Sequence, residues 1–197
     1  MIPKLPSKIL PKIKISNIDG AIRSTQIVKI LFDKNPDIHS KVEAENSIFD
    51  LVFTKKDLYS NTQKAIIKCS PSIRSLIMKS AHILIDCDCC PCQAHFFVFQ
   101  CHHCASFGHS AARCPRNNKE NLGCLFCAAK GTHDSDHCPT KFNMNGHACV
   151  NCSASNEHDI RVDAISHSGN SKYCPIYLRE ISKLALKTDY GNDFVYT

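Results

Sequence analysis

Residues 101–114 read CHHCASFGHSAARC, and this stretch decides how the second half of the chain folds. Three thiolates and one imidazole form a closed tetrahedral shell for Zn²⁺. Because so short a segment cannot bury a hydrophobic core, a bound metal has to supply its folding free energy. Gly108, directly before the histidine, suits a tight reversal of the chain. The stretch therefore predicts a CCHC zinc knuckle, spaced C-x2-C-x4-H-x4-C, whose ligands are Cys101, Cys104, His109 and Cys114.

A second copy of the pattern follows, with one more residue between its second cysteine and its histidine. It predicts a second zinc site, spaced C-x2-C-x5-H-x4-C, at Cys124, Cys127, His133 and Cys138. His137 offers a competing nitrogen, but it is adjacent to Cys138, and neighbouring residues rarely bend toward one ion in a short loop. We therefore favour His133 as the ligand.

A third copy is longer, and spacing alone leaves its histidine open. It supplies Cys149, Cys152 and Cys174, with either His158 or His167 as the fourth ligand. All three copies end in Cys-Pro, so they form an internal repeat. The sequence thus predicts three zinc ions. Because each copy carries its own ligands, we expect the loss of one site to leave the other two ordered.

Composition favours metal binding inside the cell, in the cytoplasm or the nucleus. The chain of 197 residues has 14 Cys and 11 His, and prolines occupy its N-terminal stretch where a secretory signal would be apolar. No run reaches the roughly 20 apolar residues of a membrane span. The net charge of +6 suggests an anionic partner, although three zinc-bound Cys₃His sites, each adding 2 − 3 = −1, lower it to 6 − 3 = +3.

The first half of the chain predicts a small α+β domain. Alternating apolar residues predict strands, and apolar residues at helical spacing predict helices. The predicted strands cover residues 12–19, 48–55, 64–69 and 82–87, and the predicted helices cover residues 25–34 and a segment that starts at Pro71. The order βαββαβ is that of the ferredoxin-like fold of RNA-recognition (RRM-like) modules. Its central strands lack the aromatic residues on which such modules stack bases, which favours a platform for assembly or positioning.

Several other stretches have two interpretations. Phe49 and Phe53 alternate with Leu51 on an edge strand, and we expect both to lie in the core. Residues 86–92, DCDCCPC, could in principle hold a soft metal, but we expect structural thiols at Cys87, Cys89, Cys90 and Cys92. Residues 96–99, FFVF, are expected to dock the first knuckle against the domain.

The predicted organisation has six segments, ending in a short helix over residues 176–187. They are an N-terminal extension (1–11), the RRM-like domain (12–95), the first knuckle (96–117), the second knuckle (118–140), a third, expanded unit (141–176), and the C-terminal helix and tail (177–197).

From residue 68 onward, the run KCSPSIRSLI…ILIDC…CQAHFFVFQCHHCASFGHSAARCP resembles the Gag-like first-reading-frame proteins of jockey-type non-LTR retrotransposons. Those proteins carry an RRM-like domain, a knuckle with FGH before its last cysteine, and two further CxxC units. Their third unit commonly has a histidine shortly before Cys-Pro, as in HSGNSKYCP here, and this favours His167. Three features depart from the family: His102 stands where an aromatic residue is common, the cysteines at 89, 90 and 92 are additional, and the second unit is one residue longer.

The resemblance implies a zinc-dependent protein that binds single-stranded nucleic acid and packages or remodels it in a retrotransposon ribonucleoprotein. The partner is RNA or DNA, with RNA favoured. The alternatives are a self-associating structural protein of such a particle and a cellular zinc-knuckle RNA-binding protein. An enzymatic activity is not expected, because each zinc shell is filled and no HExxH or deaminase motif is present. A small-molecule substrate and a membrane partner are not expected either.

Candidate nucleic-acid contacts lie in and after the first two knuckles. Cationic side chains suit phosphates, and aromatic rings suit unpaired bases. The alternative interpretation is that these charges are merely solvated and that these rings pack locally. The predicted phosphate contacts are Arg113, Arg116 and Lys119, and the predicted base platforms are Phe107 and Phe126.

Overall fold

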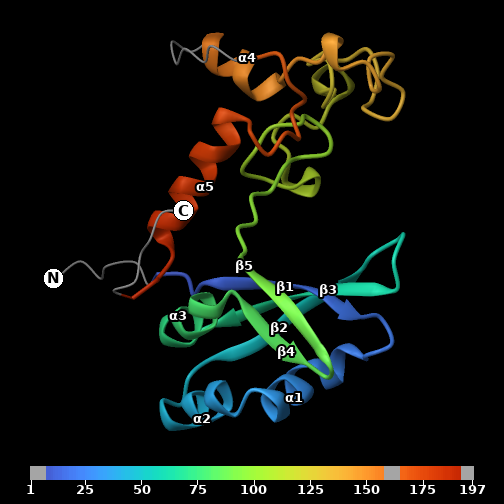
Figure 1. Cartoon of the computed structure of the whole chain (residues 1–197). Helices are drawn as coiled ribbons and strands as arrows, with labels where there is room; N and C mark the ends of the chain where they lie inside the picture. The colour runs from blue at the N-terminus through green and yellow to red at the C-terminus, as the bar shows by residue number, and fades with distance from the viewer. Residues whose placement is uncertain (1–7, 158–164, 192–197) are drawn as a thin grey trace, which may run out of the picture. The chain divides into compact units, whose positions relative to one another are not determined.

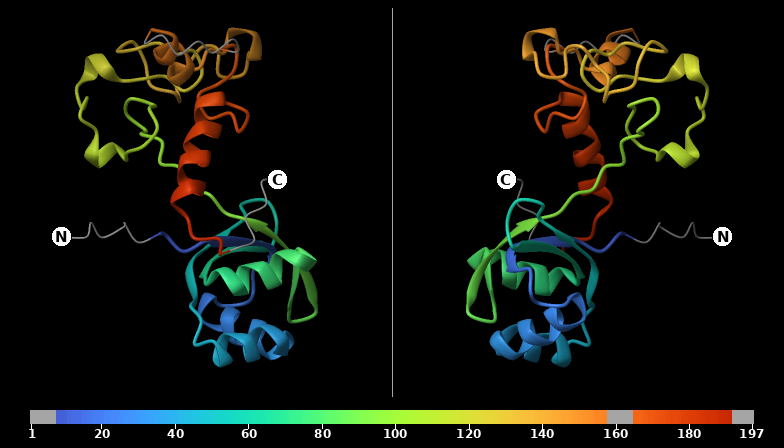
Figure 2. Two further views of the ribbon diagram at one scale, coloured as in Figure 1. Left: turned by 90° about the vertical axis from the view of Figure 1, so that its left-hand side faces the viewer. Right: turned by 90° about the vertical axis from the view of Figure 1, so that its right-hand side faces the viewer.

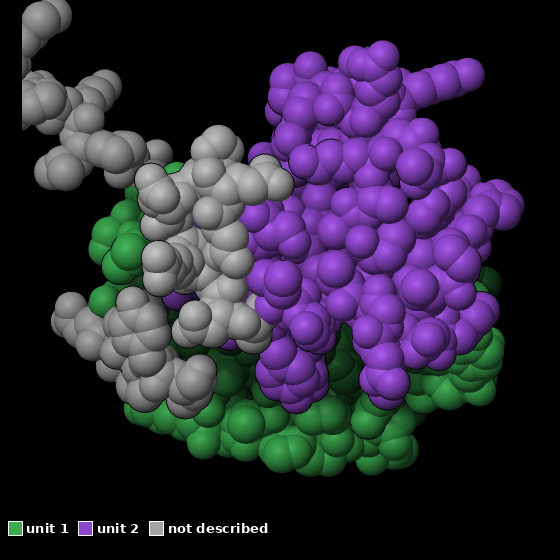
Figure 3. All heavy atoms as spheres, turned by 90° about the horizontal axis from the view of Figure 1, so that it is seen from above, with its two compact units in different colours: residues 1–96, 186–197 green, residues 97–185 purple. Residues whose placement is uncertain are grey.

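The computed structural model describes residues 8–157 and 165–191, in two compact units. Unit 1 comprises residues 1–96 and 186–197, and unit 2 comprises residues 97–185 (Figure 3). Within the described ranges, none of the helices combines the length and the hydropathy that a membrane crossing requires.

Unit 1 is an α+β domain built on one five-stranded antiparallel sheet (Figure 1). The strand order is β2-β3-β1-β5-β4, and the helices α1, α2 and α3 lie on one side of the sheet (Figure 2). In chain order the elements are β1 (Lys12–Asp19), α1 (Ser24–Lys34), α2 (Pro36–Ala44), β2 (Phe49–Lys56), β3 (Thr62–Cys69), α3 (Pro71–Ser80), β4 (His82–Ile85) and β5 (Asp88–Ala94).

The core of unit 1 lies between the sheet and these helices. Successive residues of a strand point to opposite faces, so every second residue of a central strand meets the helices. Ile13 and Ile15 of β1 and Ile67 of β3 are fully buried against Leu31 of α1 and Ile77 of α3. Each such side chain contributes about 1.5–3 kcal/mol when it leaves water. The predicted α+β class is confirmed.

The sheet has one strand more than the sequence predicts. β5, from the cysteine-rich run, pairs with β1, so the predicted fourth strand β4 lies at the edge of the sheet. Asp86, with a φ of 56°, helps to reverse the chain between these two strands. Cys90 and Cys92 alternate into the core as small apolar side chains. The sequence conceals this strand because Asp and Pro are rare in strands, and cysteine is a weak signal.

The structure also contains a helix, α2, that the sequence does not predict. Asn35 ends α1, as expected for a residue before proline, with φ −130° and ψ 75°. Pro36 then begins α2 at a position where its missing N–H has no partner to lose. One proline therefore both stops the first helix and starts the next.

Phe49 is buried at 8 % exposure as expected, but the prediction for Phe53 is wrong, because this side chain is 47 % exposed. A β-bulge between Leu51 and Phe53 interrupts the pairing of β2 with β3. An extra residue in one strand turns the side chains that follow it to the other face of the sheet. Phe53 consequently pairs with Ile66 on the face away from the helices.

The cysteine-rich run divides into buried and exposed thiols. Burial raises the pKa of Cys90 to about 11 and that of Cys92 to about 12, so both stay protonated at neutral pH. Cys87 and Cys89 are exposed. The interpretation as structural thiols therefore fits Cys90 and Cys92, and it is wrong for Cys87 and Cys89.

The chain end that follows α5 (Pro175–Lys187) packs within unit 1. Ile9 forms a parallel bridge with Thr188, and its carbonyl accepts from the Asp189 N–H at 2.7 Å. The Tyr190 ring lies 4.6 Å from the guanidinium of Arg74 and 6.5 Å from the ring of Phe96. The sequence predicts the helix but gives no signal for this attachment.

Asn35 is a buried polar residue whose loss should destabilise unit 1. Its amide donates to the carbonyls of Leu31 at 2.6 Å and Leu84 at 2.7 Å, and it accepts from the Leu84 N–H at 3.1 Å. We expect Asn35→Ala to lower the free energy of unfolding by about 2–4 kcal/mol, because the main-chain N–H and carbonyl of Leu84 lose these partners. The Leu31 carbonyl keeps the backbone N–H of residue 35 at 3.0 Å. Urea unfolding of the zinc-loaded chain measures this change in stability. Asp33→Ala, at an exposed position of the same helix, is the control and should stay within about 0.5 kcal/mol. Equal effects of the two would contradict the role of Asn35.

Candidate metal centres

Unit 2 brings together three groups of side chains, each made of three cysteines and one histidine. In every group the candidate ligand atoms all lie within 4.8 Å of one another. Site 1 is Cys101, Cys104, His109 and Cys114, site 2 is Cys124, Cys127, His133 and Cys138, and site 3 is Cys149, Cys152, His167 and Cys174. His158, the other candidate for site 3, lies outside the described residues.

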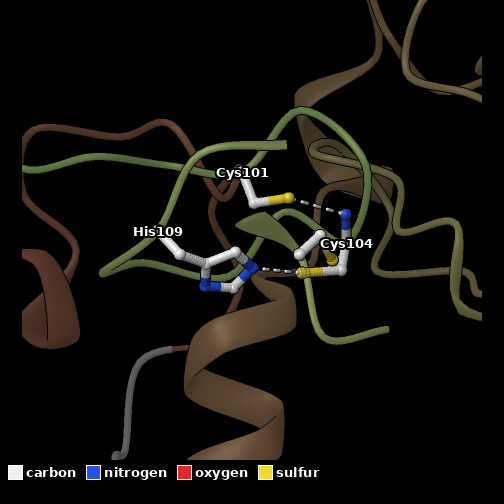
Figure 4. Close-up of side chains that lie close together, drawn as sticks. Cys101, Cys104 and His109 are labelled. Atoms are coloured by element: carbon white, nitrogen blue, oxygen red, sulfur yellow. Dashed lines mark hydrogen bonds between the residues drawn. The ribbon is translucent and has the colours of Figure 1, made fainter. Parts of the chain in front are cut away.

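The spacing of these atoms fits a tetrahedral Zn²⁺. Zinc bonds of about 2.3 Å to sulfur and about 2.0–2.1 Å to nitrogen place two sulfurs about 3.8 Å apart, and a sulfur about 3.6 Å from a nitrogen. In site 1, the Cys104 sulfur lies 3.4 Å from His109 Nε2 (Figure 4). In site 3, the Cys174 sulfur lies 3.7 Å from that of Cys149 and 3.5 Å from that of Cys152. The residues present therefore fit the metal that the sequence predicts.

Sites 1 and 2 share one backbone design. In both, the N–H of the first cysteine donates to the carbonyl five residues later at 2.9 Å, the residue after the second cysteine has a positive φ, and a glycine with positive φ follows. In site 1 the accepting, positive-φ and glycine residues are Ser106, Ala105 and Gly108, and in site 2 they are Ala129, Ala128 and Gly131. The sequence repeat is thus also a repeat of the backbone.

Site 3 is built differently, from the beginnings of two helices. Cys149 directly precedes α4 (Val150–Glu157), which contains Cys152, and Cys174 directly precedes α5. The N-terminus of a helix favours negative charge and lowers the pKa of a nearby thiol. Site 3 therefore departs from the knuckle form that the sequence suggests for all three copies.

One thiol in each site is predisposed to ionise, because its neighbours donate hydrogen bonds to it. Burial raises the pKa of Cys104, but hydrogen bonds from Ser106 and the neighbouring cysteines outweigh it and bring the pKa to about 6. Cys138 likewise reaches a pKa of about 6, with bonds from Thr140 overcoming burial. At Cys174, a hydrogen bond from Cys149 is the main cause of a pKa of about 4. Zinc binds thiolates, so each site offers one preformed anionic ligand.

Other histidines near these sites have different partners. The Nδ1 of His137 lies 2.7 Å from an Asp134 carboxylate oxygen, and its side chain is 81 % exposed. His133 instead directs Nε2 to the Cys127 sulfur at 3.4 Å, while its Nδ1 lies 3.0 Å from the Thr132 hydroxyl. Such a second partner fixes the orientation of a ligating imidazole.

Two of the predicted nucleic-acid contacts take part in the structure of unit 2. Arg116 donates to the Ser106 hydroxyl at 2.7 Å and to the Cys104 sulfur at 3.9 Å, so it is a partner of site 1 that offsets thiolate charge. Phe107 is half-buried and packs on Tyr177 of α5, with ring centroids 5.7 Å apart. The sequence could not show either contact, because Tyr177 is 70 residues away and an arginine near a knuckle suits both roles.

The other three predicted contacts have different surroundings. Arg113 and Lys119 are exposed, each in a short 3₁₀ turn. Phe126 is half-buried, and its ring lies 5.5 Å from that of His147.

The three sites are linked by hydrogen bonds between their loops. The Gly123 N–H, beside site 2, donates to the His103 carbonyl of site 1 at 2.7 Å. The Gly169 N–H, beside site 3, donates to the Leu125 carbonyl of site 2 at 2.6 Å. Gln100 links sites 1 and 3, because its amide donates to the carbonyls of Ala105 in site 1 and Gly169 in site 3.

Gly123 also shows how closely two of these loops approach. A Cβ atom at this position would lie 2.6 Å from the carbonyl oxygen of Cys104, a distance that side-chain carbons do not adopt. Only glycine allows this contact between sites 1 and 2. The expectation that each site folds independently is therefore replaced by that of one interlocked unit.

Alkylation should separate the thiols into three classes. Of 14 cysteines, nine belong to the three sites, three (Cys69, Cys90 and Cys92) are buried in unit 1, and 14 − 9 − 3 = 2 are exposed, Cys87 and Cys89. The buried thiols should not react, since burial raises the pKa of Cys69 and Cys92 to about 12 and that of Cys90 to about 11. Iodoacetamide followed by mass spectrometry should count two adducts on the zinc-loaded chain, 2 + 9 = 11 after chelation, and all 14 after denaturation. Fewer than eleven after chelation would indicate disulfides, and more than two before it would indicate open sites.

Removing one ligand should weaken all three sites. We expect Cys104→Ser to empty site 1 and to speed the release of the other two ions about ten-fold or more, because shared hydrogen bonds contribute about 1 kcal/mol each. Native mass spectrometry during chelator challenge follows each loss. Cys89→Ser, which changes an exposed thiol outside the sites, is the control. Release of the remaining ions at the parent rate would show that the sites are independent after all.

Comparison with protein-family models, with curated proteins and with solved structures finds no match to this chain.

Proposed function

We propose that the chain is a zinc-dependent protein that binds single-stranded nucleic acid, with RNA as its main ligand and three structural zinc ions. Each site offers four protein ligands, which leaves no coordination position for a water or a substrate. A filled shell supports a folding role for the metal rather than catalysis. Sites 1 and 2 would be knuckles, and site 3 a helical variant of them.

The observation that carries this proposal is a pocket beside site 1. Phe107 and Tyr177 lie in its wall with Val98 and Gln100, and its volume is about 150 Å³. Asn170 and Lys172 add polar groups at the wall. An aromatic ring beside hydrogen-bonding groups suits an unpaired base, because every base has a stacking face and polar edges. The pocket thus supports the expected role of Phe107, with Tyr177 as an additional aromatic side chain.

The charge of unit 2 indicates how such binding would work. Residues 97–185 contain nine Lys and Arg and seven Asp and Glu, and three zinc-bound sites bring 9 − 7 = +2 to 2 − 3 = −1. A unit without excess positive charge cannot rely on long-range attraction to phosphates. Base stacking would therefore provide most of the affinity of this unit, with Arg113 and Lys119 as local phosphate contacts.

For unit 1 we propose a variant of the RRM-like ferredoxin fold. The neighbouring strands β2, β3 and β1 support this, and β5 would take the position of the fourth strand, with β4 added at the edge. A Gag-like role in packaging or remodelling RNA in a retrotransposon particle, including self-association, is the biological setting that the sequence resemblance favours.

The test is to remove the aromatic wall while keeping the metal. We expect Phe107→Ala to weaken binding of a labelled oligouridine strand by about 1–3 kcal/mol at every salt concentration, because a stacked base is lost. Arg113→Ala should instead flatten the slope of log K against log salt by about 0.7, since one phosphate contact is lost. Fluorescence anisotropy measures both, and native mass spectrometry confirms three bound ions.

Phe142 provides the matched control, because it is 94 % exposed in the same unit and lines no pocket among those described. Phe142→Ala should bind as the parent does. If a zinc-loaded Phe107→Ala also bound like the parent, Phe107 would serve packing alone, and the proposed base pocket would be refuted.

A further inference from the structure

The face of the sheet away from the helices carries an unusual set of side chains. Because Ile13, Ile15 and Ile67 face the core, their neighbours along β1 and β3 face the other way. Cross-strand pairing places Lys14 beside Ile66, and Ile66 beside Phe53. The residues of this lysine face are Lys12, Lys14, Phe53, Lys55, Lys64, Ile66 and Lys68.

Like charges lie directly opposite each other on this face. Lys12 pairs with Lys68 between β1 and β3, and Lys55 pairs with Lys64 between β2 and β3. Such pairs destabilise a sheet, because the ammonium groups repel each other across a short distance. Threonine or glutamine at these positions would serve the fold better, so the lysines indicate a role other than folding.

Acidic side chains balance only part of this charge. Lys68 forms an ion pair with Asp50 at 2.9 Å, and Lys64 forms one with Asp57 at 3.6 Å. In the described part of the chain, Lys12, Lys14 and Lys55 form no ion pair with an acidic residue. The excess positive charge also affects His95, whose N–H donates to the Lys12 carbonyl. Burial, together with the charges of Lys12 and Lys14, lowers the pKa of His95.

Aromatic surface accompanies the charge. Phe53, turned to this face by the bulge in β2, is 47 % exposed between the two lysine pairs. At the tip of the β2–β3 hairpin, Tyr59 is 96 % exposed and Leu58 is 88 % exposed. They line a hollow of about 340 Å³ together with Lys55, Lys56, Lys64 and Asp57, the ion-pair partner of Lys64.

We propose that the lysine face is a second binding surface for single-stranded nucleic acid, in which lysines hold phosphates and Phe53 stacks on one base. Alternating cations and an exposed ring are what an unpaired strand requires, because its phosphates and bases are both accessible. Lysine, as a compact point charge, holds phosphates without selecting a base, so this surface binds with little sequence preference. The inference rests on the proposed nucleic-acid-binding function but places most of the electrostatic affinity in unit 1.

The charge balance of the two units agrees with this assignment. Residues 1–96 and 186–197 contain 15 Lys and Arg and 11 Asp and Glu, a net charge of 15 − 11 = +4, against −1 for zinc-loaded unit 2. Long-range attraction of a polyanion therefore acts mainly on unit 1.

The experiment neutralises the three lysines without acidic partners in the zinc-loaded full chain. The test variant is Lys12→Gln/Lys14→Gln/Lys55→Gln. The control variant, Lys29→Gln/Lys34→Gln/Lys79→Gln, removes the same charge from exposed positions of α1 and α3. Binding of a labelled oligouridine strand is measured over a series of salt concentrations, and thermal unfolding is recorded for every variant.

We expect the test variant to flatten the slope of log K against log salt by about 2, since three phosphate contacts at about 0.7 each are lost. Its melting temperature should stay the same or rise, because like-charge repulsion is relieved. The control variant should change the slope by less than about 0.7, the value for one phosphate contact. Phe53→Ala should weaken binding about five- to 150-fold at every salt concentration. Phe53→Tyr, which keeps an aromatic ring, should bind like the parent.

Equal slopes for the test and control variants would overturn the inference, as would a test variant that loses affinity only because it melts at a lower temperature. The outcome for Phe107→Ala separates the two proposals. An effect there without an effect at the lysine face would leave the zinc-dependent function standing and refute the second surface. The reverse would refute the base pocket and leave the lysine face. A parent chain that binds no oligouridine at any salt concentration would refute both.

Discussion

The convergence of three sulfurs and one nitrogen in each of three sites, a set that fits a tetrahedral Zn²⁺, is the constraint on which unit 2 depends. Of the eleven buried apolar residues described in this unit, seven are ligand cysteines: Cys101, Cys104, Cys124, Cys138, Cys149, Cys152 and Cys174. The ligands therefore occupy the place that aliphatic side chains have in unit 1, where Ile13, Ile15 and Ile67 meet three helices. The described residues of unit 2 form no apolar core of the size found in unit 1, so we expect its folding and its metal binding to be coupled.

Three such sites in series would ordinarily be three independent structures, because each shell closes over a short stretch of chain. Here the loops share partners: Gln100 donates to Ala105 in site 1 and to Gly169 in site 3, and Gly123 contacts the carbonyl of Cys104. A bound ion thus fixes main-chain groups that a neighbouring site needs. Coupling of this kind makes the relative placement of the three sites part of the fold. It also explains how Phe107 of site 1 and Tyr177 of α5 come to line one pocket.

Whether a feature of this structure can be predicted from the sequence depends on how far apart in the chain the residues that determine it lie. Zinc ligands are set by spacing within one loop, so the residues that meet in the three sites are readable from the sequence, including His167 once the family pattern is added. The core positions Ile13 and Phe49 follow from local alternation. Features that depend on other segments are not readable: the bulge that turns Phe53 outward depends on pairing with β3, and β5 is recognisable only beside β1. Arg116 is a similar case, because the sequence is equally compatible with its hydrogen bond to Ser106 and with a solvated side chain.

Zinc chemistry also determines how charge is distributed between the units. A Cys₃His shell with its ion carries a charge of −1, so three such sites lower the net charge of unit 2 by three. A unit that binds nucleic acid would need positive charge at the same place. Arg116, bonded to the Cys104 sulfur, is partly consumed in offsetting the negative charge. To offset this charge within unit 2, more cationic side chains would have to lie beside the thiolates. Those side chains would then no longer be free to bind phosphates. Placing cations on the lysine face of unit 1 avoids that conflict, because no thiolate competes for Lys12, Lys14 or Lys55 there. The repulsion between opposed lysines lowers the stability of the sheet. That cost is what the proposed division of roles would require, in which unit 2 contacts bases and the sheet of unit 1 holds phosphates.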